Sequence, residues 1–187
     1  MHANFRNKDT ISLQKYKDFR AVVARNAPAA GEKVVQRPAS QMKQMRNYDC
    51  ALEYAAYLTA SRCSATDDSA NSPANNENQY IARSSNAAPL DAAKEAIKSW
   101  FGEIKRNKMP QGAGQKNLYS SRLGIPHGAR FIWETHTTIG CAIAKCSTFF
   151  KVVCYYSPEL ASVGPLLLKG PVFALYSEFC CRNMENR

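Results

Sequence analysis

The sequence has no apolar run approaching the roughly 18 residues that a membrane-spanning helix requires. Its longest apolar passages, 148–156 and 166–176, are interrupted by lysine, glycine or proline. The first twenty residues also lack the apolar core of a signal peptide, so we expect the numbering to describe a mature chain or one with an added Met1. These absences favour a water-soluble domain without a transmembrane segment.

Clustered basic residues are missing as well. Lysine and arginine outnumber aspartate and glutamate by 25 to 15, which gives a net charge of +10. They occur singly, without a run of five or more and without a base-stacking motif, so we expect no nucleic-acid partner. A generally cationic surface remains open to acidic glycans or anionic lipids.

The seven cysteines form no Cys-x-x-Cys pair and no zinc-finger spacing. Dispersed cysteines in a chain of 187 residues are typical of disulfides formed in an oxidising compartment. The composition therefore predicts a secreted, extracellular protein with a single hydrophobic core.

Hydrophobic periodicity predicts three helices, over 10–25, 50–62 and 91–104. Asp49 and Asp91 are the expected N-caps of the second and third. The second helix is rich in alanine, which suits close approach to a neighbouring element. Three helices followed by extended segments indicate an α+β layered domain.

Two β-type runs, Ile139–Ala144 and Phe149–Tyr156, flank a polar connection and predict a β-hairpin. If the turn is symmetric about Ser147-Thr148, opposed residues have numbers that sum to 295. Cys141 then lies directly opposite Cys154, within the reach of a disulfide.

Three residues could converge to hold a divalent cation or to carry acid–base chemistry: Glu77, Glu103 and His127. Glu77 is expected where a strand starts, Glu103 near the buried face of the third helix, and His127 just before an apolar run. The ordinary alternative is that Glu103 pairs with Arg106, Glu77 caps a loop and His127 bonds to the backbone. The sequence separations alone do not decide between these interpretations.

Seven phrases of the sequence resemble the CAP superfamily, which comprises cysteine-rich secretory, antigen 5 and pathogenesis-related proteins. The resemblance is nearest to the venom-allergen-like or activation-associated secreted proteins of parasitic nematodes. The phrases lie at residues 19–25, 48–53, 77–80, 100–104, 127–133, 139–142 and 152–158.

The resemblance implies a three-layer α-β-α sandwich with a central antiparallel sheet, stabilised by disulfides. It implies one CAP domain over 1–187, with 159–187 as a C-terminal extension. By family pattern Cys63 pairs with Cys146 and Cys141 with Cys154. The same pattern leaves Cys50 to pair with Cys180 or Cys181.

The family cleft contains two histidines and two glutamates, and Glu77, Glu103 and His127 match three of these positions. Asp67 or Asp68 stands where the second histidine is expected, which favours a harder cation than zinc, bound weakly or not at all. Arg130 replaces the usual glutamine three residues after His127, and a fixed cation there is expected to lower the pKa of that histidine.

The resemblance implies a secreted, non-enzymatic protein that binds a lipid, a sterol or a host protein and modulates the immunity of a parasite's host. Two alternatives remain: a metal-dependent hydrolase or protease that uses Glu77, Glu103 and His127, and an electrostatic binder of acidic glycans. No nucleophile motif and no His-Glu-x-x-His sequence supports the hydrolase. The sequence does not indicate the oligomeric state.

Overall fold

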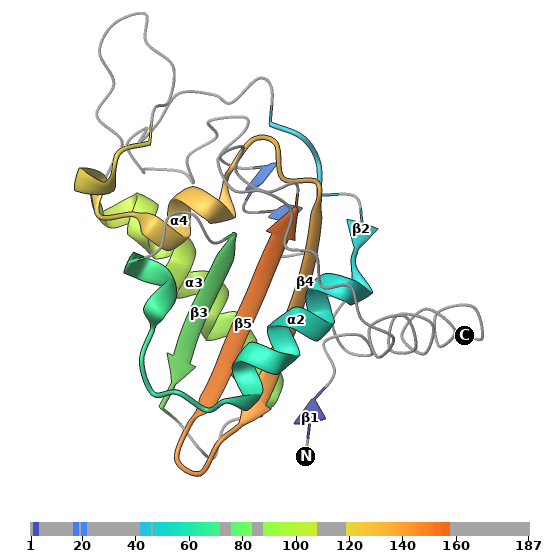
Figure 1. The fold of residues 1–187 in the computed structure, drawn as a ribbon. Helices are drawn as coiled ribbons and strands as arrows, with labels where there is room; N and C mark the ends of the chain where they lie inside the picture. Colours follow the sequence, from blue (N-terminus) through green and yellow to red (C-terminus); the bar gives the residue numbers. More distant parts are fainter. Residues whose placement is uncertain are drawn as a thin grey trace, which may run out of the picture.

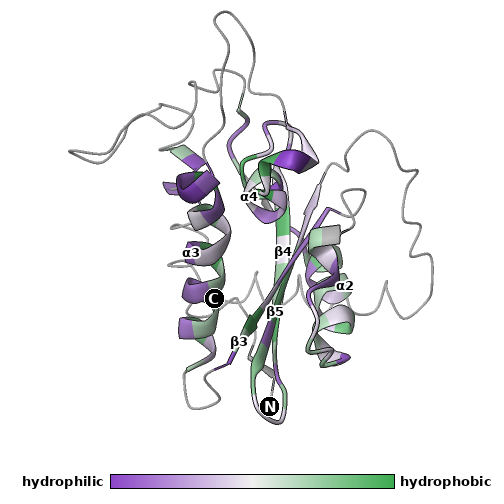
Figure 2. Cartoon of the chain, turned by 90° about the vertical axis from the view of Figure 1, so that its left-hand side faces the viewer, coloured by the Kyte–Doolittle hydropathy of each residue, from purple (hydrophilic) through white to green (hydrophobic). Residues whose placement is uncertain are grey.

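The computed structural model describes residues 2–3, 17–18, 20–21, 42–45, 47–71, 76–83, 88–107 and 119–157. In these residues a five-stranded sheet lies between helix α2 on one face and helix α3 on the other (Figures 1 and 2). The α-β-α sandwich expected from the resemblance is confirmed. None of the helices in the described part is long and apolar enough to cross a membrane.

The sheet is built on the predicted hairpin, formed by β4 (Thr138–Lys145) and β5 (Phe150–Ser157). Cys141 lies opposite Cys154 in the hairpin, so the predicted register, in which the numbers of opposed residues sum to 295, is confirmed. Strand β3 (Glu77–Ala82) is antiparallel to β5, and two short strands pair with β4: β1 (His2–Ala3), antiparallel, and β2 (Asn47–Tyr48), parallel.

Helix α2 (Cys50–Ser61) begins where the sequence predicts. The Oδ1 atom of Asp49 accepts hydrogen bonds from the backbone N–H groups of Ala51 and Leu52, at 2.8 and 2.9 Å. This N-cap satisfies two of the four amides that a helix start leaves without partners.

Small residues let α2 lie directly on β4. Ala56 and Ala60 pack against Ala142, Ala144 and Val153 on this face of the sheet. A Cβ atom added to Gly140 would lie 2.2 Å from the backbone nitrogen of Glu53 in α2. The helix and the strand therefore meet backbone to backbone, as the alanine content of α2 predicts.

Helix α3 (Pro89–Asn107) covers the other face of the sheet and starts earlier than predicted. Asp91 is not its N-cap, because the carbonyl of Ala88 already accepts hydrogen bonds from the amides of Asp91 and Ala92. Pro89 instead takes the first helical position, where its missing N–H is not needed. The helix contributes Trp100 and Ile104, among others, to the larger core cluster, which it shares with the strands.

Three short elements complete the described part of the fold: η1 (Asp68–Asn71), η2 (Ser121–Leu123) and α4 (Pro126–Phe131). Sequence periodicity does not predict α4, since six residues are too few for a helical pattern. Its signal is local, because Pro126 occupies the first turn. Helix α4 packs on α3 and carries His127.

Arg20 ties the N-terminal part of the chain to the segment after α4. Its guanidinium donates hydrogen bonds to four backbone carbonyls, those of Phe131, Trp133, Lys43 and His136, at 2.8 to 3.3 Å. Of the helix predicted over 10–25, residues 17, 18, 20 and 21 are described, and they are helical. The rest of that prediction lies outside the described residues.

Two disulfides are present as predicted, Cys63–Cys146 and Cys141–Cys154. The first joins residues 83 positions apart and ties the end of α2 to the end of β4. In the chain-entropy model a loop of this size contributes about 4–5 kcal/mol. Cys50 is buried, but Cys180, Cys181 and the extension 159–187 lie outside the described residues, so the third pairing and the domain extent stay predictions.

We expect Gly140→Ala to lower the free energy of unfolding by about 2–3 kcal/mol, because the added methyl group meets the backbone of α2. Gly102→Ala on α3 is the matched control. Its methyl group would meet only the flexible end of Arg106, and alanine favours a helix by about 1 kcal/mol over glycine. Urea denaturation of both variants measures the difference, and an equal effect would contradict the close contact.

Candidate functional site

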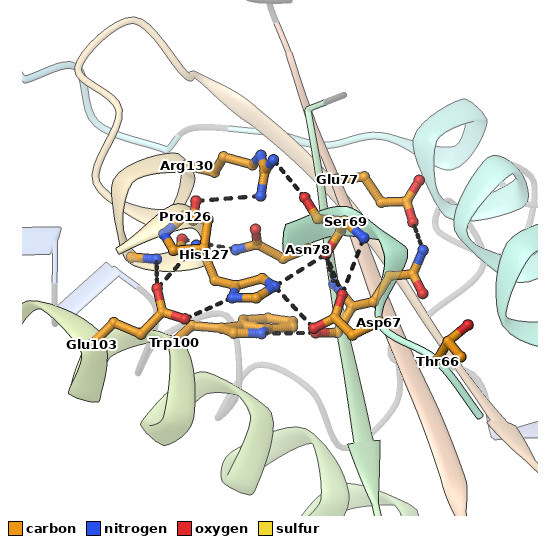
Figure 3. A network of polar contacts seen from close by, with 12 residues as sticks. Thr66, Asp67, Ser69, Glu77, Asn78, Trp100, Glu103, Pro126, His127 and Arg130 are labelled. Atoms are coloured by element: carbon orange, nitrogen blue, oxygen red, sulfur yellow. Dashed lines mark hydrogen bonds and ion pairs between the residues drawn. The ribbon is translucent and has the colours of Figure 1, made fainter. Parts of the chain in front are cut away.

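His127 and Glu103 meet where α4 crosses α3 (Figure 3). The Nδ1 atom of His127 lies 2.6 Å from the Oε1 atom of Glu103. The histidine is buried, with 7% of its surface exposed, and 15% of the Glu103 side chain is exposed. The sequence prediction that Glu103 lies near the buried face of its helix is therefore correct, and its carboxylate contacts His127 rather than the Arg106 of the ordinary alternative.

Glu103 also holds the start of α4. Its Oε2 atom accepts hydrogen bonds from the backbone amides of His127 and Gly128, at 3.0 and 2.8 Å. Ile125 stands at the N-cap and has no side chain that can accept these bonds. Gly128 makes the approach possible, since a Cβ atom there would lie 2.8 Å from a side-chain carbon of Ile104. One carboxylate from α3 thus replaces the missing cap of α4.

The other side of the imidazole faces the segment that follows α2. The Nε2 atom of His127 lies 3.0 Å from Oδ2 of Asp67 and 3.1 Å from Oγ of Ser69. Ser69 in turn donates a hydrogen bond to Oδ1 of Asp67 at 2.6 Å and accepts one from the amide of Gln79. His127 therefore lies between two carboxylates, as Figure 3 shows.

Two buried cations hold this segment in place. The ammonium of Lys151 donates a hydrogen bond to the carbonyl of Thr66 at 2.5 Å, and the guanidinium of Arg130 donates one to the carbonyl of Ser69 at 2.7 Å. Lys151 and Arg130 are 1% and 3% exposed. Sequence reasoning missed Ser69 and Lys151, because nothing in their local sequence indicates a buried role.

The two carboxylates set the charge of His127. Burial alone would lower its pKa, but the hydrogen bonds and charges of Asp67 and Glu103 outweigh burial and raise the pKa to about 9. Burial opposes ionisation of Asp67 too, yet its contacts with His127 and Ser69 lower its pKa overall. His127 is thus an imidazolium at neutral pH, and both ring nitrogens donate protons.

The prediction that Arg130 leaves His127 with a lowered pKa is wrong. We expected a cation at this position to lower the pKa of His127, whereas that pKa is raised. Arg130 directs its guanidinium to the carbonyls of Ser69 and Pro126, while the two carboxylates lie in direct contact with the imidazole. Contact distance decides which charge controls the histidine.

Glu77 is buried at the start of β3, as predicted, but its carboxylate does not contact His127 in a hydrogen bond. It accepts hydrogen bonds from the side-chain amide of Gln79 and from the hydroxyl of Tyr155. Burial, followed by the hydrogen bond to Glu77, raises the pKa of Tyr155. The structure therefore brings Glu103 and His127 together and places Glu77 in a neighbouring network (Figure 3).

His136 has the opposite environment. It is fully buried and stacks on Tyr156, with ring centroids 5.2 Å apart. Burial lowers its pKa to about 4, and the charges of Arg20 and Arg130 act in the same direction. The Nδ1 atom lies 3.0 Å from the carbonyl of Arg130, a partner that requires no positive charge on the ring. Of His127 and His136, it is His127 whose protonated form neighbouring carboxylates stabilise.

The arrangement is poorly suited to catalysis. Ser69, His127 and Glu103 stand in the order of a nucleophile, a base and an orienting acid. However, Asp67 holds a proton on the nitrogen that would have to accept one from Ser69, and Ser69 is 2% exposed. A buried hydroxyl next to a protonated histidine has neither a free base nor access to a substrate.

Comparisons with known proteins agree with the fold. The family model of the cysteine-rich secretory protein family (CAP) matches residues 2–156. Hookworm platelet inhibitor 1 of Ancylostoma caninum is 33% identical over 146 residues, which are 78% of this chain and 61% of that protein. Ancylostoma secreted protein of the same species is 30% identical over 162 residues, covering 81% of this chain and 36% of that protein.

Two solved structures are also similar. The crystal structure of NaASP2 with Zn²⁺ has a TM-score of 0.66 and 26% identity, and the match covers 83% of this chain and 81% of that one. The crystal structure of hookworm platelet inhibitor has a TM-score of 0.59 and 28% identity, over 86% and 74%. The chain spans less than two thirds of both curated relatives.

The presence of Zn²⁺ in the NaASP2 structure raises the question of whether this site fits a metal ion. In the described part of the chain, no three His, Cys, Asp or Glu side chains are grouped so that they could hold one. A metal on His127 would also have to displace a proton that Asp67 or Glu103 holds. These residues do not fit zinc, and the weak cation site of Glu77, Glu103 and His127 stays a prediction.

The pKa of His127 predicts how stability depends on pH. Its folded value of about 9 exceeds the ordinary value of 6.5, so the folded protein binds this proton more tightly than the unfolded chain. The contribution, on the order of 3 kcal/mol, is complete below pH 6.5 and is lost as pH rises to 9. Urea denaturation from pH 6 to 10 should show this loss in the wild type and a smaller one in His127→Gln.

We expect no saturable zinc binding at pH 7, because displacing a proton of pKa about 9 weakens apparent affinity about a hundredfold. Asp67→His should remove the acid that holds this proton, add a nitrogen ligand beside Nε2, and so create measurable binding. Asp68→His, at the exposed neighbouring position, is the control. Isothermal titration calorimetry with Zn²⁺ compares the three proteins. Tight binding by the wild type would contradict the assignment.

Proposed function

Because this chain belongs to the cysteine-rich secretory protein family, we propose that it is secreted and acts without catalysis, by binding a host molecule. The observation that carries the proposal is the state of His127. Both of its ring nitrogens face carboxylates, at 2.6 and 3.0 Å, so the side chain best placed for acid–base chemistry is already engaged. The contacts of His127 with Asp67 and Glu103 support a rigid scaffold, and we infer that the protein binds its ligand through its surface.

The relatives support an extracellular role. One is named as a secreted protein and another as a platelet inhibitor, and both come from a hookworm. Two disulfides in the described residues fit an oxidising compartment. We infer that the ligand is either a host protein or a lipid or sterol, and that binding modulates the host's immune response on behalf of a parasite.

The second candidate, a metal-dependent hydrolase or protease, has less support. It needs Glu77, Glu103 and His127 to converge on a metal ion or a water molecule. The carboxylate of Glu77 is instead occupied by Gln79 and Tyr155. The electrostatic binder of acidic glycans remains open, because the chain carries a net charge of +10.

We expect the purified chain to bind at least one of three ligand classes: sterols, fatty acids, or a protein on the surface of intact platelets. Direct titration covers the first two, and flow cytometry with labelled protein covers the third. Glu103→Gln removes the acid beside His127, and Glu95→Gln, at an exposed position of the same helix, is the matched control.

If the protein acts by binding, both variants should keep wild-type affinity to within about twofold wherever circular dichroism shows that they are folded, because neither residue makes the contact. Peptide and ester hydrolysis with added zinc, magnesium or calcium is measured alongside. Turnover that Glu103→Gln abolishes and Glu95→Gln preserves would establish catalysis instead. If the protein binds none of the three ligand classes, the binding proposal is contradicted.

A further inference from the structure

Exposed basic residues gather at the C-terminal end of α3. Lys98, Lys105 and Arg106 are exposed on this helix, and Arg122 is exposed on η2. Lys98 and Lys105 are seven residues apart, so they lie on one face, about 10 Å along the axis. We call Lys98, Lys105, Arg106 and Arg122 the basic strip. Figure 2 shows that α3 carries many hydrophilic residues.

Local contacts arrange these cations. A Cβ atom at Gly102 would lie 2.9 Å from Nη1 of Arg106, so the guanidinium occupies the space that the glycine leaves on the helix surface. The ammonium of Lys105 lies 5.6 Å from the centre of the Phe101 ring. Both long side chains therefore lie along the helix surface, each reaching back to the residue four positions earlier.

Helix α3 and η2 are joined at this end. The side-chain amide of Asn107 donates a hydrogen bond to the carbonyl of Gly124 at 2.6 Å. This contact places η2, and with it Arg122, beside the last turn of α3 (Figure 1). The basic strip thus crosses from one element to the next, and its members come from positions up to 24 residues apart in the sequence.

From Lys105 onward, no acidic residue in the sequence interrupts this region. Between Glu103 and Glu134 there is no aspartate or glutamate, whereas Lys105, Arg106, Lys108, Lys116, Arg122 and Arg130 all fall there. Glu103, which precedes Lys105, turns inward to His127 and to the start of α4. Its charge is committed to the interior, so it does not neutralise the surface of the same helix.

We propose that the basic strip is a binding surface for a linear polyanionic glycan, such as a sulfated polysaccharide of the extracellular matrix. A strip of point charges at the end of a helix fits a flexible chain of sulfates and carboxylates, which it would bind mainly through electrostatic attraction. The proposal does not depend on which ligand the protein binds elsewhere.

The distribution of apolar residues favours a glycan over a membrane. Binding to a lipid surface normally combines basic residues with exposed apolar side chains that enter the bilayer. In the described part of the chain, Leu58 is the one large apolar residue that is exposed, and it belongs to α2, on the opposite face of the sheet (Figure 2). The basic strip has no such anchor beside it.

Heparin serves as the probe. The variant Lys105→Gln/Arg106→Gln/Arg122→Gln removes three charges from the strip. The control Arg62→Gln/Arg83→Gln/Lys145→Gln removes three exposed charges at the far end of the sheet, where α2, β3 and β4 end (Figure 1). Both variants have the same net charge, so they differ only in where charge is lost. Affinity is measured over a series of salt concentrations.

We expect the strip variant to bind heparin roughly tenfold more weakly than the wild type, with a shallower dependence of affinity on salt, because it releases fewer counterions. The control variant should stay within about twofold of the wild type. Equal losses in both variants would overturn the proposal, since net charge alone would then explain binding. Vesicles with 30% phosphatidylserine are the comparison, and tighter binding to them than to heparin would overturn it in favour of a membrane.

Discussion

The carboxylate of Glu103 is the group on which the local architecture depends. It accepts hydrogen bonds from two backbone amides of α4 and contacts the imidazole of His127. Helix α4 has six residues, too few to be stable by themselves, and its N-cap residue offers no acceptor. Glu103 supplies the acceptor from a long helix that is fixed in the core. The position of His127, and of the segment that meets its far side, follows from this one contact.

Burying charge is costly, and the protein offsets the cost by pairing. Asp67 and Glu103 flank one imidazolium, and Lys151 and Arg130 lie close enough to affect the same group of charges. Such a buried set adds less to net stability than its short distances suggest, because desolvation opposes attraction. The contacts of this set instead join the segment after α2 to α4 and α3, because His127 of α4 lies between Asp67 and Glu103. A site built in this manner holds its shape and has little freedom to exchange protons with a substrate.

Much of the fold could be predicted from the sequence because its signals are periodic. The register of β4 and β5 follows from the symmetry of two apolar runs, and α2 follows from Asp49 and the alanines behind it. The start of α3 was misplaced because Pro89 and Asp91 are both acceptable at a helix start, and only the hydrogen bonds to Ala88 distinguish them.

The site was less predictable, since its contacts join residues from four segments. The resemblance left Asp67 and Asp68 as alternatives at the position of the missing histidine, and only the structure shows that Asp67 contacts His127. The direction of the pKa shift of His127 depended on where Arg130 points. Lys151 gave no signal at all: a lysine in an alternating strand is expected to face water. Its burial is explained by the hydrogen bond that its ammonium donates to the carbonyl of Thr66, a contact between residues far apart in the sequence.

The disulfide between Cys63 and Cys146 has a consequence for how the protein responds to proteolysis. The loop that it closes contains Asp67, Glu77, Glu103 and His127, and also the whole basic strip. A protease that cuts the chain once within this loop leaves both fragments covalently joined. The site and the strip would therefore stay attached to one particle after nicking, and separation would require both a cut and a reductant.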